Sequence, residues 1–263
     1  MRPPALLSVE GVSFAYRRGM WALHAVDLRV AAGEFTAIIG NNGSGKSTLM
    51  KLLVGLLKPT VGRVVVDGVD TRTARVSQLA RRVGFIFQNP NDQLFANTVA
   101  EEIRFGLRNL GLPPAEIEAR LEATLAQFGL EPMRDVFPRF LSRGDKQKVC
   151  LASIVAMQPR ILLLDEPTTG QDHRDSRAIL ELATALNQQG ITVLLVTHDL
   201  NNVAAYTRRV VVLRDGEVVR DGPTAQVMSD VALLDACSLV APQIVRLSLS
   251  VADLGLPLAL SVE

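Results

Sequence analysis

The sequence Glu34-Phe-Thr-Ala-Ile-Ile-Gly40-Asn-Asn-Gly-Ser-Gly-Lys46-Ser47 joins an apolar, β-branched run to a glycine-rich loop. The run predicts a buried strand, and the residues that follow, Ser47 to Leu57, predict a helix. Glycines leave the backbone N–H groups of such a loop unobstructed, and the helix adds its positive end, so the loop can hold an anion. The segment therefore predicts a phosphate-binding loop in an α/β fold.

The loop matches the pattern G-x-x-x-x-G-K-[ST] without a mismatch. In this pattern we expect Lys46 to reach the β- and γ-phosphates of a nucleotide, and the Ser47 hydroxyl to ligate Mg²⁺. Thr48 is expected to add a phosphate contact. The residues expected to hold the nucleotide here are Gly40, Asn41, Asn42, Gly43, Ser44, Gly45, Lys46, Ser47 and Thr48.

A second element is the run Ile161-Leu-Leu-Leu-Asp165-Glu166. A strand that ends in two carboxylates places charge at the exit of a buried element, which is costly unless the charge is paired. Asp165 suits the Mg²⁺ shell, and Glu166 suits the polarisation of an attacking water. The alternative, a pair of solvated acids before a turn at Pro167, would be favoured only if the phosphate loop were absent.

The remaining pattern alternates strands with helices and predicts a mainly parallel sheet. Further strands are expected at Leu6–Tyr16, Leu23–Val30, Gly62–Val66, Val83–Phe87, Ile191–Thr197 and a hairpin of Val210–Leu213 with Glu217–Val219. Helices are expected at Glu101–Leu110, Ala115–Gly129, Asp145–Met157 and Asp175–Gln189. Because only helices are expected between Asn89 and Met157, this segment interrupts the α/β core as an insertion.

The composition excludes some classes of function. The chain has 263 residues, 48% of them hydrophobic, and a net charge of +1 from 28 basic and 27 acidic residues. Such a balance gives no field that would attract nucleic acid, so no nucleic-acid partner is expected.

No apolar run approaches the ~20 residues that a membrane-spanning helix needs, and no signal peptide is visible. Cys150 and Cys237 lack metal-ligand spacing and are expected to be reduced thiols.

Several further motifs, in a fixed order along the chain, resemble those of the ABC (ATP-binding cassette) ATPases. Leu141-Ser-Arg-Gly-Asp145 resembles the family's LSGGQ signature, with Arg143 in place of Gly and Asp145 in place of Gln. Thr169-Gly-Gln-Asp172 is similar to its D-loop. In this chain Tyr16 resembles the family's A-loop aromatic, Gln88 its Q-loop glutamine and His198 its switch histidine.

The resemblance implies an α/β fold of the P-loop NTPase class, with a RecA-like parallel sheet core, antiparallel N-terminal strands and an inserted α-helical subdomain. The implied domains are a nucleotide-binding core at 1–88 and 158–222, the helical insertion with the signature loop at 89–157, and a C-terminal helical tail at 223–263 that contacts a second cassette. It also implies ATP and Mg²⁺ as ligands. The roles implied are catalysis for Lys46, Gln88, Glu166 and His198, adenine stacking for Tyr16, phosphate contacts for Ser142 and Gly144, and Mg²⁺ ligation for Ser47, Gln88 and Asp165.

Within this superfamily the chain resembles the ATPase subunits of energy-coupling factor importers and of cobalt and nickel uptake systems. The residues that carry this likeness are Phe87-Gln-Asn-Pro-Asn-Asp-Gln-Leu-Phe95 and the tail motifs Pro242-Gln-Ile-Val-Arg246 and Leu254-Gly-Leu-Pro257. By this likeness Leu94 and Phe95 line the groove for a transmembrane partner, although either could be core of the insertion.

The likeness implies a motor for vitamin or transition-metal import, held peripherally at the cytoplasmic face of the cell membrane. The implied partners are integral T and S components and a second ATPase subunit, and the altered signature favours a heterodimer. Tyr16 could instead be a core aromatic. The alternative functions are an ABC ATPase of another importer class and a non-transport ABC ATPase.

Overall fold

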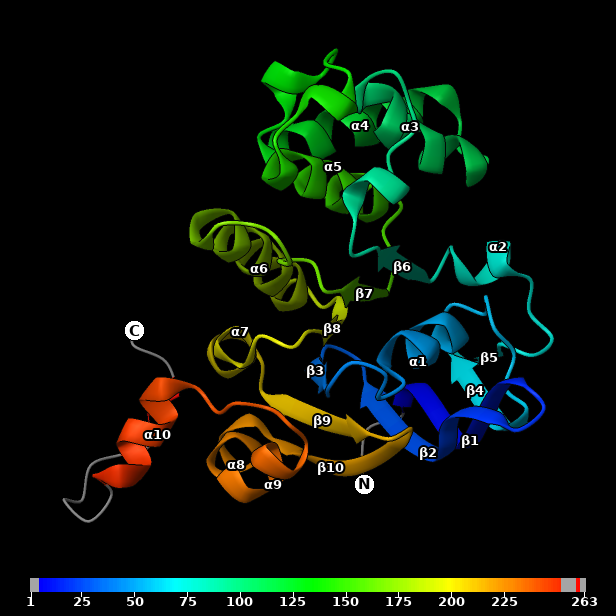
Figure 1. Cartoon of the computed structure of the whole chain (residues 1–263). Helices are drawn as coiled ribbons and strands as arrows, with labels where there is room; N and C mark the ends of the chain where they lie inside the picture. The colour runs from blue at the N-terminus through cyan, green and yellow to red at the C-terminus, as the bar shows by residue number, and fades with distance from the viewer. Residues whose placement is uncertain (1–4, 252–258, 261–263) are drawn as a thin grey trace.

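The computed structural model describes residues 5–251 and 259–260. The tail motif Leu254-Gly-Leu-Pro257 lies outside the described residues. The described chain forms a central sheet with helices on both sides, a second sheet built mainly from the N-terminal strands, and a helical lobe at one end (Figure 1). None of the helices in this part of the chain is long and apolar enough to cross a membrane.

The central sheet has six strands in the order β10-β9-β3-β8-β7-β6. All neighbours pair in parallel except β9 and β10, which form the expected antiparallel hairpin. The predicted mainly parallel sheet is thus confirmed. Every residue of β3 is buried, as a central parallel strand covered on both faces requires. The strand bounds are β3 Phe35–Ile39, β6 Val83–Ile86, β7 Ile161–Asp165, β8 Thr192–Val196, β9 Arg209–Arg214 and β10 Glu217–Pro223.

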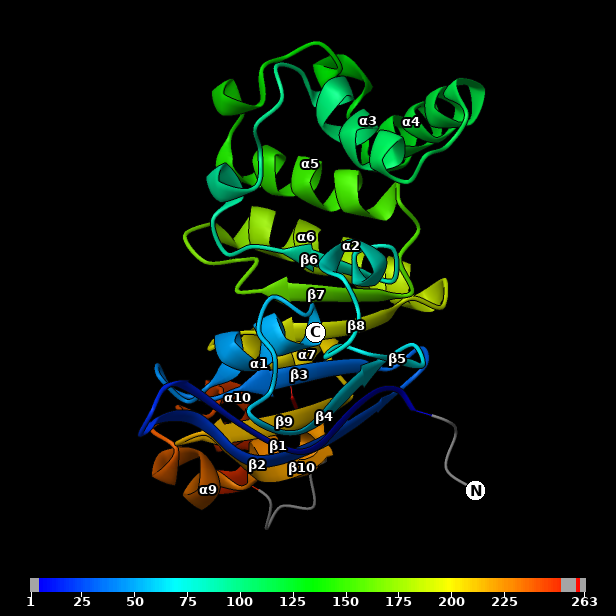
Figure 2. The ribbon, with the colours of Figure 1, turned by 90° about the vertical axis from the view of Figure 1, so that its right-hand side faces the viewer.

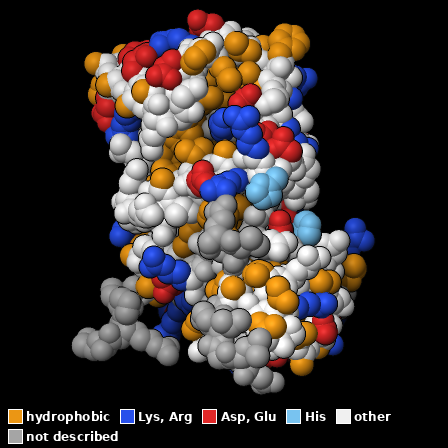
Figure 3. Space-filling model, turned by 90° about the vertical axis from the view of Figure 1, so that its left-hand side faces the viewer, with side chains coloured by type: hydrophobic (Ala, Val, Ile, Leu, Met, Phe, Trp, Pro, Cys, Tyr) orange, Lys and Arg blue, Asp and Glu red, His pale blue; other side chains and the backbone are white. Residues whose placement is uncertain are grey.

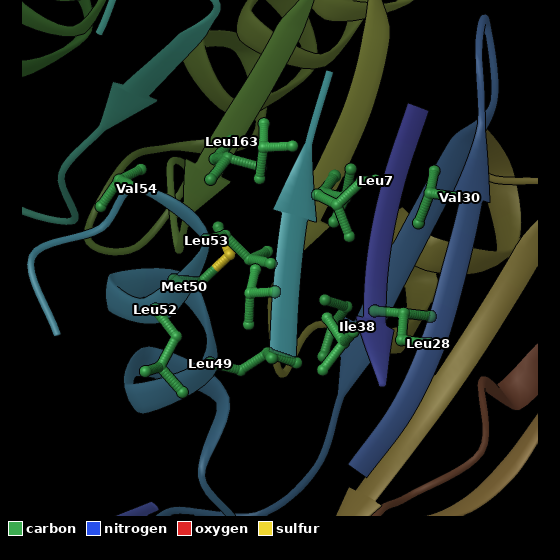
Figure 4. Close-up of a cluster of buried hydrophobic side chains, with 14 of the residues drawn as sticks. Leu7, Leu28, Val30, Ile38, Leu49, Met50, Leu52, Leu53, Val54 and Leu163 are labelled. Carbon is green, nitrogen blue, oxygen red and sulfur yellow. The ribbon is translucent and has the colours of Figure 1, made fainter. Parts of the chain in front are cut away.

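The second sheet is antiparallel, with the order β2-β1-β4-β5, and lies at the end of the molecule opposite the helical lobe (Figure 2). Its strands are β1 Ala5–Arg17, β2 Met20–Ala31, β4 Val61–Val66 and β5 Val69–Asp70. Helix α1 (Lys46–Leu53) shares one buried apolar cluster with both sheets. Figure 4 shows labelled side chains of α1, among them Leu49 and Leu53, gathered with Ile38 of β3 and Leu7 of β1.

Between β6 and β7 all the regular elements are helical, as the sequence predicted. These elements are η1 Pro90–Asp92, α3 Val99–Asn109, α4 Pro114–Phe128, η2 Glu131–Met133, η3 Pro138–Phe140 and α5 Arg143–Val155. They form the lobe at the top of Figures 1 and 2. Its core is continuous with the central sheet, because Val149 of α5 and Leu121 of α4 belong to the same buried cluster as Leu162 and Val193. Helix α5 therefore shares a buried core with β7, the strand that ends in the two carboxylates.

The other helices are α2 Val76–Leu79, α6 His173–Gln188, α7 Leu200–Tyr206, α8 Thr224–Ser229, α9 Val231–Ala236 and α10 Gln243–Ser250. Helix α7 was not predicted, since seven residues are too few for a clear helical period. Its start is nevertheless marked by Asp199, whose carboxylate accepts from the N–H groups of Asn201 and Asn202. Strand β10 extends past the predicted Val219 to Pro223 because its pairing with β9 continues through polar residues.

Candidate functional site

The phosphate loop connects β3 to α1 and is held by its own lysine. Nζ of the buried Lys46 donates to the carbonyl oxygens of Gly40 at 2.8 Å and Asn41 at 2.9 Å. Only glycine fits at position 40, because a methyl group there would lie 2.2 Å from the Leu213 carbonyl oxygen and 2.6 Å from Oγ of Ser44. Burial lowers the pKa of Lys46, and the carboxylates of Glu166 and Asp165 oppose that shift. The loop thus carries a buried cation close to two anions.

The two carboxylates follow one another at the end of β7. Burial raises the pKa of Asp165, the Glu166 carboxylate raises it further, and Lys46 opposes both. Because two partly buried carboxylates lie side by side, the site favours the binding of a cation between them and a bound phosphate.

Glu166 is held from several sides. Its Oε1 lies 2.8 Å from Nδ1 of His198, and its Oε2 accepts from the hydroxyls of Thr169 at 3.2 Å and Thr197 at 3.4 Å. Its φ of 49° is uncommon for a non-glycine residue. Backbone strain of this kind persists where neighbouring structure fixes it, and it gathers at functional sites.

One open cavity of about 440 Å³ brings most of the expected nucleotide residues together. It is lined by Tyr16, Ala22, Asn42, Gly43, Ser44, Gly45, Lys46, Ser47, Thr48, Gln88, Asp165, Glu166 and His198. Gly40 and Asn41 lie beside it as acceptors of the Lys46 ammonium. Ala22 is the lining residue that the sequence did not predict, because its place depends on the hairpin of β1 and β2.

Tyr16 stands at the end of β1 and is 53% exposed, so it is not the core aromatic that the sequence left open. Its ring meets that of the buried Phe14 edge to face, with centroids 5.0 Å apart. Its hydroxyl lies 3.0 Å from Oγ1 of Thr48 in the phosphate loop. The ring is therefore fixed at the mouth of the cavity, where an exposed face can accept a flat ligand.

The signature residues do not line this cavity. Ser142 caps α5, since its Oγ accepts from the N–H of Asp145 at 3.1 Å and donates to the Asp145 carboxylate at 2.7 Å. Gly144 lies in the first turn and is buried against the Asp175 carboxylate. These residues present a helix start on a separate surface, so any nucleotide they bind sits outside the chain's own cavity.

The oxygen donors at the cavity fit Mg²⁺ better than a transition metal. Ser47, Gln88 and Asp165 offer one hydroxyl, one amide and one carboxylate, the hard oxygen ligands that Mg²⁺ takes together with water and substrate phosphates. In the described part of the chain no three His, Cys, Asp or Glu residues form a metal cage. Cys150 and Cys237 are free and buried, and burial raises the pKa of both thiols.

A strand-loop-helix cradle with a buried lysine, facing two carboxylates at a neighbouring strand end, defines a P-loop nucleotide-binding fold. The chain belongs to the ABC transporter family, which its residues 23–169 match. It is an ABC ATPase, and an ATPase domain of this kind implies ATP hydrolysis.

Named relatives agree with this assignment. The chain is 39% identical over 240 residues to the energy-coupling factor transporter ATP-binding protein EcfA of Methanothermobacter thermautotrophicus, covering 90% of this chain and 77% of that protein. It is 41% identical over 254 residues to an ABC transporter ATP-binding protein of Methanosarcina acetivorans, covering 97% of this chain but only 41% of that protein. The chain thus spans less than half the length of that longer relative.

Solved structures share the fold. CbiO1 of Clostridium perfringens, described as part of the ABC transporter complex CbiONQ, superposes with a TM-score of 0.81 at 33% identity, covering 95% of this chain and 97% of that one. The ATP-binding cassette MJ0796, solved as a dimer with ADP and phosphate, gives 0.74 at 32% identity, covering 83% and 98%.

Proposed function

We propose that this chain binds and hydrolyses ATP to power a membrane importer of the energy-coupling factor type, for a vitamin or a transition metal. Its likeness to EcfA and to CbiO1 supports the class. The observation that carries the proposal is an apolar groove beside the nucleotide cavity, which fits a helix of a membrane partner. The proposed units are a core of residues 1–88 and 158–222, a helical subdomain of residues 89–157 and a tail of residues 223–263.

The groove has a volume of about 770 Å³ and is lined by residues of α2, of β6 and of the helical lobe. Phe87, Phe95 and Phe105 line it, and the rings of Phe95 and Phe105 meet edge to face with centroids 4.6 Å apart. Phe95 is 59% exposed, which is unusual for so large an apolar side chain. Leu94, in contrast, is buried in the core of the lobe, so the prediction that it lines the groove is wrong.

The groove and the nucleotide cavity share one connecting segment. Phe87 belongs to the groove, and Gln88, the next residue, belongs to the cavity. A displacement of Gln88 would therefore move the part of the groove that contacts a partner helix. A displacement of the partner helix would likewise move Gln88 at the nucleotide cavity. This adjacency is the physical route by which hydrolysis could drive transport.

In the proposed reaction Lys46 offsets the negative charge that develops on the β- and γ-phosphates. Glu166 orients the attacking water, and His198, held by Glu166, contacts the γ-phosphate. Tyr16 stacks on the adenine. When bound, Mg²⁺ would be held by Ser47, Gln88 and Asp165, and it supplies positive charge to the phosphates.

We further propose that the chain pairs with a second cassette, with the signature residues Ser142 and Gly144 facing the nucleotide on that partner. The ATP-binding cassette MJ0796 was solved as a dimer, which supports a pair of cassettes here. We favour a heterodimer because Arg143 and Asp145 depart from the signature. Helix α10 exposes Leu247, which suits the tail to a dimer contact.

The remaining proposed partners are integral T and S components, which the chain meets at the cytoplasmic face of the cell membrane. No nucleic-acid partner is proposed. Basic and acidic side chains are interspersed on the face shown in Figure 3, which offers no broad basic surface among the described residues there.

The test is co-purification with membrane proteins. Phe95→Asp should abolish recovery of integral proteins from detergent extracts, because burying an unpaired carboxylate in an apolar groove is costly. Nucleotide binding should be retained, and Val219→Asp, an exposed position outside the groove, is the matched control. Undiminished recovery of the same integral proteins by Phe95→Asp would reject the groove as their docking site.

A further inference from the structure

Arg143, which stands where the ABC signature has a glycine, contacts the chain's own D-loop. A methyl group placed on Gly170 would lie 3.3 Å from Cζ, 3.5 Å from Nε and 3.6 Å from Nη1 of Arg143. The guanidinium therefore lies against the Gly170 backbone. Gly170 has a φ of 72°, so both its backbone conformation and the adjacent guanidinium favour glycine.

This contact is one of packing rather than of charge. Among the residues that the structure describes, Arg143 forms no ion pair. A guanidinium is planar and weakly hydrated, so it can lie flat against a peptide group in a way that a lysine ammonium cannot. The departure from the signature thus adds a contact within the chain, since a glycine at position 143 would have no side chain to contact Gly170.

The contact lies next to the residues that hold Glu166. Thr169 precedes Gly170, and its hydroxyl donates to Oε2 of Glu166 at 3.2 Å. The Thr169 N–H also donates to the Glu166 carbonyl at 3.2 Å. Gln171 follows, and its Nε2 donates to the carbonyl of Pro167 at 3.0 Å. Residues 166–171 are thus one internally bonded turn, with the catalytic carboxylate at one end and the Arg143 contact near the other.

Helix α5 and the turn each contain a glutamine with a buried amide atom. Both amide atoms of Gln147 and Oε1 of Gln171 are buried without a hydrogen-bond partner among the described residues. Gln147 lies one helical turn beyond Arg143, on the same side of α5. The contact of Arg143 with Gly170 therefore joins the start of α5 to this turn.

We propose that Arg143 is a positioning residue for Glu166 of its own chain, which makes the signature loop and the water-orienting carboxylate move together. The inference rests on the proposed function, because it assigns Glu166 to hydrolysis and the signature loop to a second cassette. Through the Arg143–Gly170 contact, binding of the signature to the partner's nucleotide orders the hydrolytic site of the same chain. Arg143 does not line the chain's own cavity, so it acts on turnover and not on nucleotide affinity.

The test uses assemblies of two cassettes in which only one retains its water-orienting carboxylate. Where only this chain retains Glu166, Arg143→Ala should lower kcat roughly 10- to 100-fold, the cost of a misplaced catalytic group. KM for ATP should stay unchanged. Where this chain carries Glu166→Gln and only the partner turns over, Arg143→Ala should lower kcat much less than in the first assembly. Arg139→Ala removes an exposed positive charge just before the signature and should leave both assemblies unaffected.

A double-mutant cycle tests the route. If Arg143 acts through Thr169, then Arg143→Ala added to Thr169→Val should cost no further activity. Arg143→Lys keeps the charge but not the plane, and it should behave like Arg143→Ala. Loss confined to the partner's turnover, additive losses in the cycle, or full rescue by lysine would each overturn the proposal. An unaltered assembly that hydrolyses no ATP would instead reject the proposed function, so the two failures are distinguishable.

Discussion

Tyr16→Ala should weaken ATP binding by an amount that the structure allows us to estimate. An aromatic side chain offers roughly 150–250 Å², and an exposure of 53% leaves about 100 Å² of Tyr16 open. A base stacked on one face would remove about half of that area from water, worth about 1.3 kcal/mol at about 25 cal/mol per Å². The dissociation constant for ATP should therefore rise about eightfold.

Tyr16→Phe separates the ring from its hydroxyl. It keeps the stacking face and loses only the bond to Thr48, which water can replace at this exposed position. The dissociation constant should then change by less than about threefold. Isothermal titration calorimetry with ATP measures both variants, and inorganic tripolyphosphate, which has no base, is the control ligand. An unchanged ATP affinity in Tyr16→Ala, or an equal loss of affinity for tripolyphosphate, would refute adenine stacking on this ring.

Two further predictions concern stability. Leu94→Ala should lower the free energy of unfolding by roughly 2–5 kcal/mol, because it opens a cavity in the core of the lobe. Phe95→Ala should cost far less, and equal urea midpoints for the two variants would contradict the burial difference. Hydrogen bonds from Arg104 hold the pKa of Glu118 below its ordinary value of 4.5, so their stabilisation is present at neutral pH and lost as pH falls below that value. Glu118→Gln should thus unfold more easily than wild type at pH 7 but not in strong acid, and a difference that persists in acid would contradict this origin.

The phosphate loop and the strand that ends in two carboxylates could be predicted because their chemistry is local. A strand, a run of glycines and a helix start are contiguous, so sequence alone places their backbone amides together. The convergence of Tyr16, Gln88 and His198 was expected only by resemblance, since the central sheet and the β1–β2 hairpin bring them together from distant parts of the chain.

Other features depend on tertiary packing that no local pattern records. Leu94 and Phe95 are neighbours in a loop without helical or strand periodicity, yet one is buried and the other is exposed. The contact of Arg143 with Gly170 joins the first residue of α5 to the loop before α6, and the two meet because α5 packs beside the start of α6. The sequence marked Arg143 as a departure from the signature, but no local pattern connects it with Gly170.

The most direct test of the central claim is the steady-state rate of ATP hydrolysis by Glu166→Gln in the assembled complex. The substitution preserves size and removes the charge that orients water, so hydrolysis should fall by more than about 100-fold. ATP binding should persist, and the trapped nucleotide should stabilise the paired cassettes. Hydrolysis within about tenfold of the unaltered complex would contradict the assignment of Glu166, and with it the hydrolytic site described for this chain.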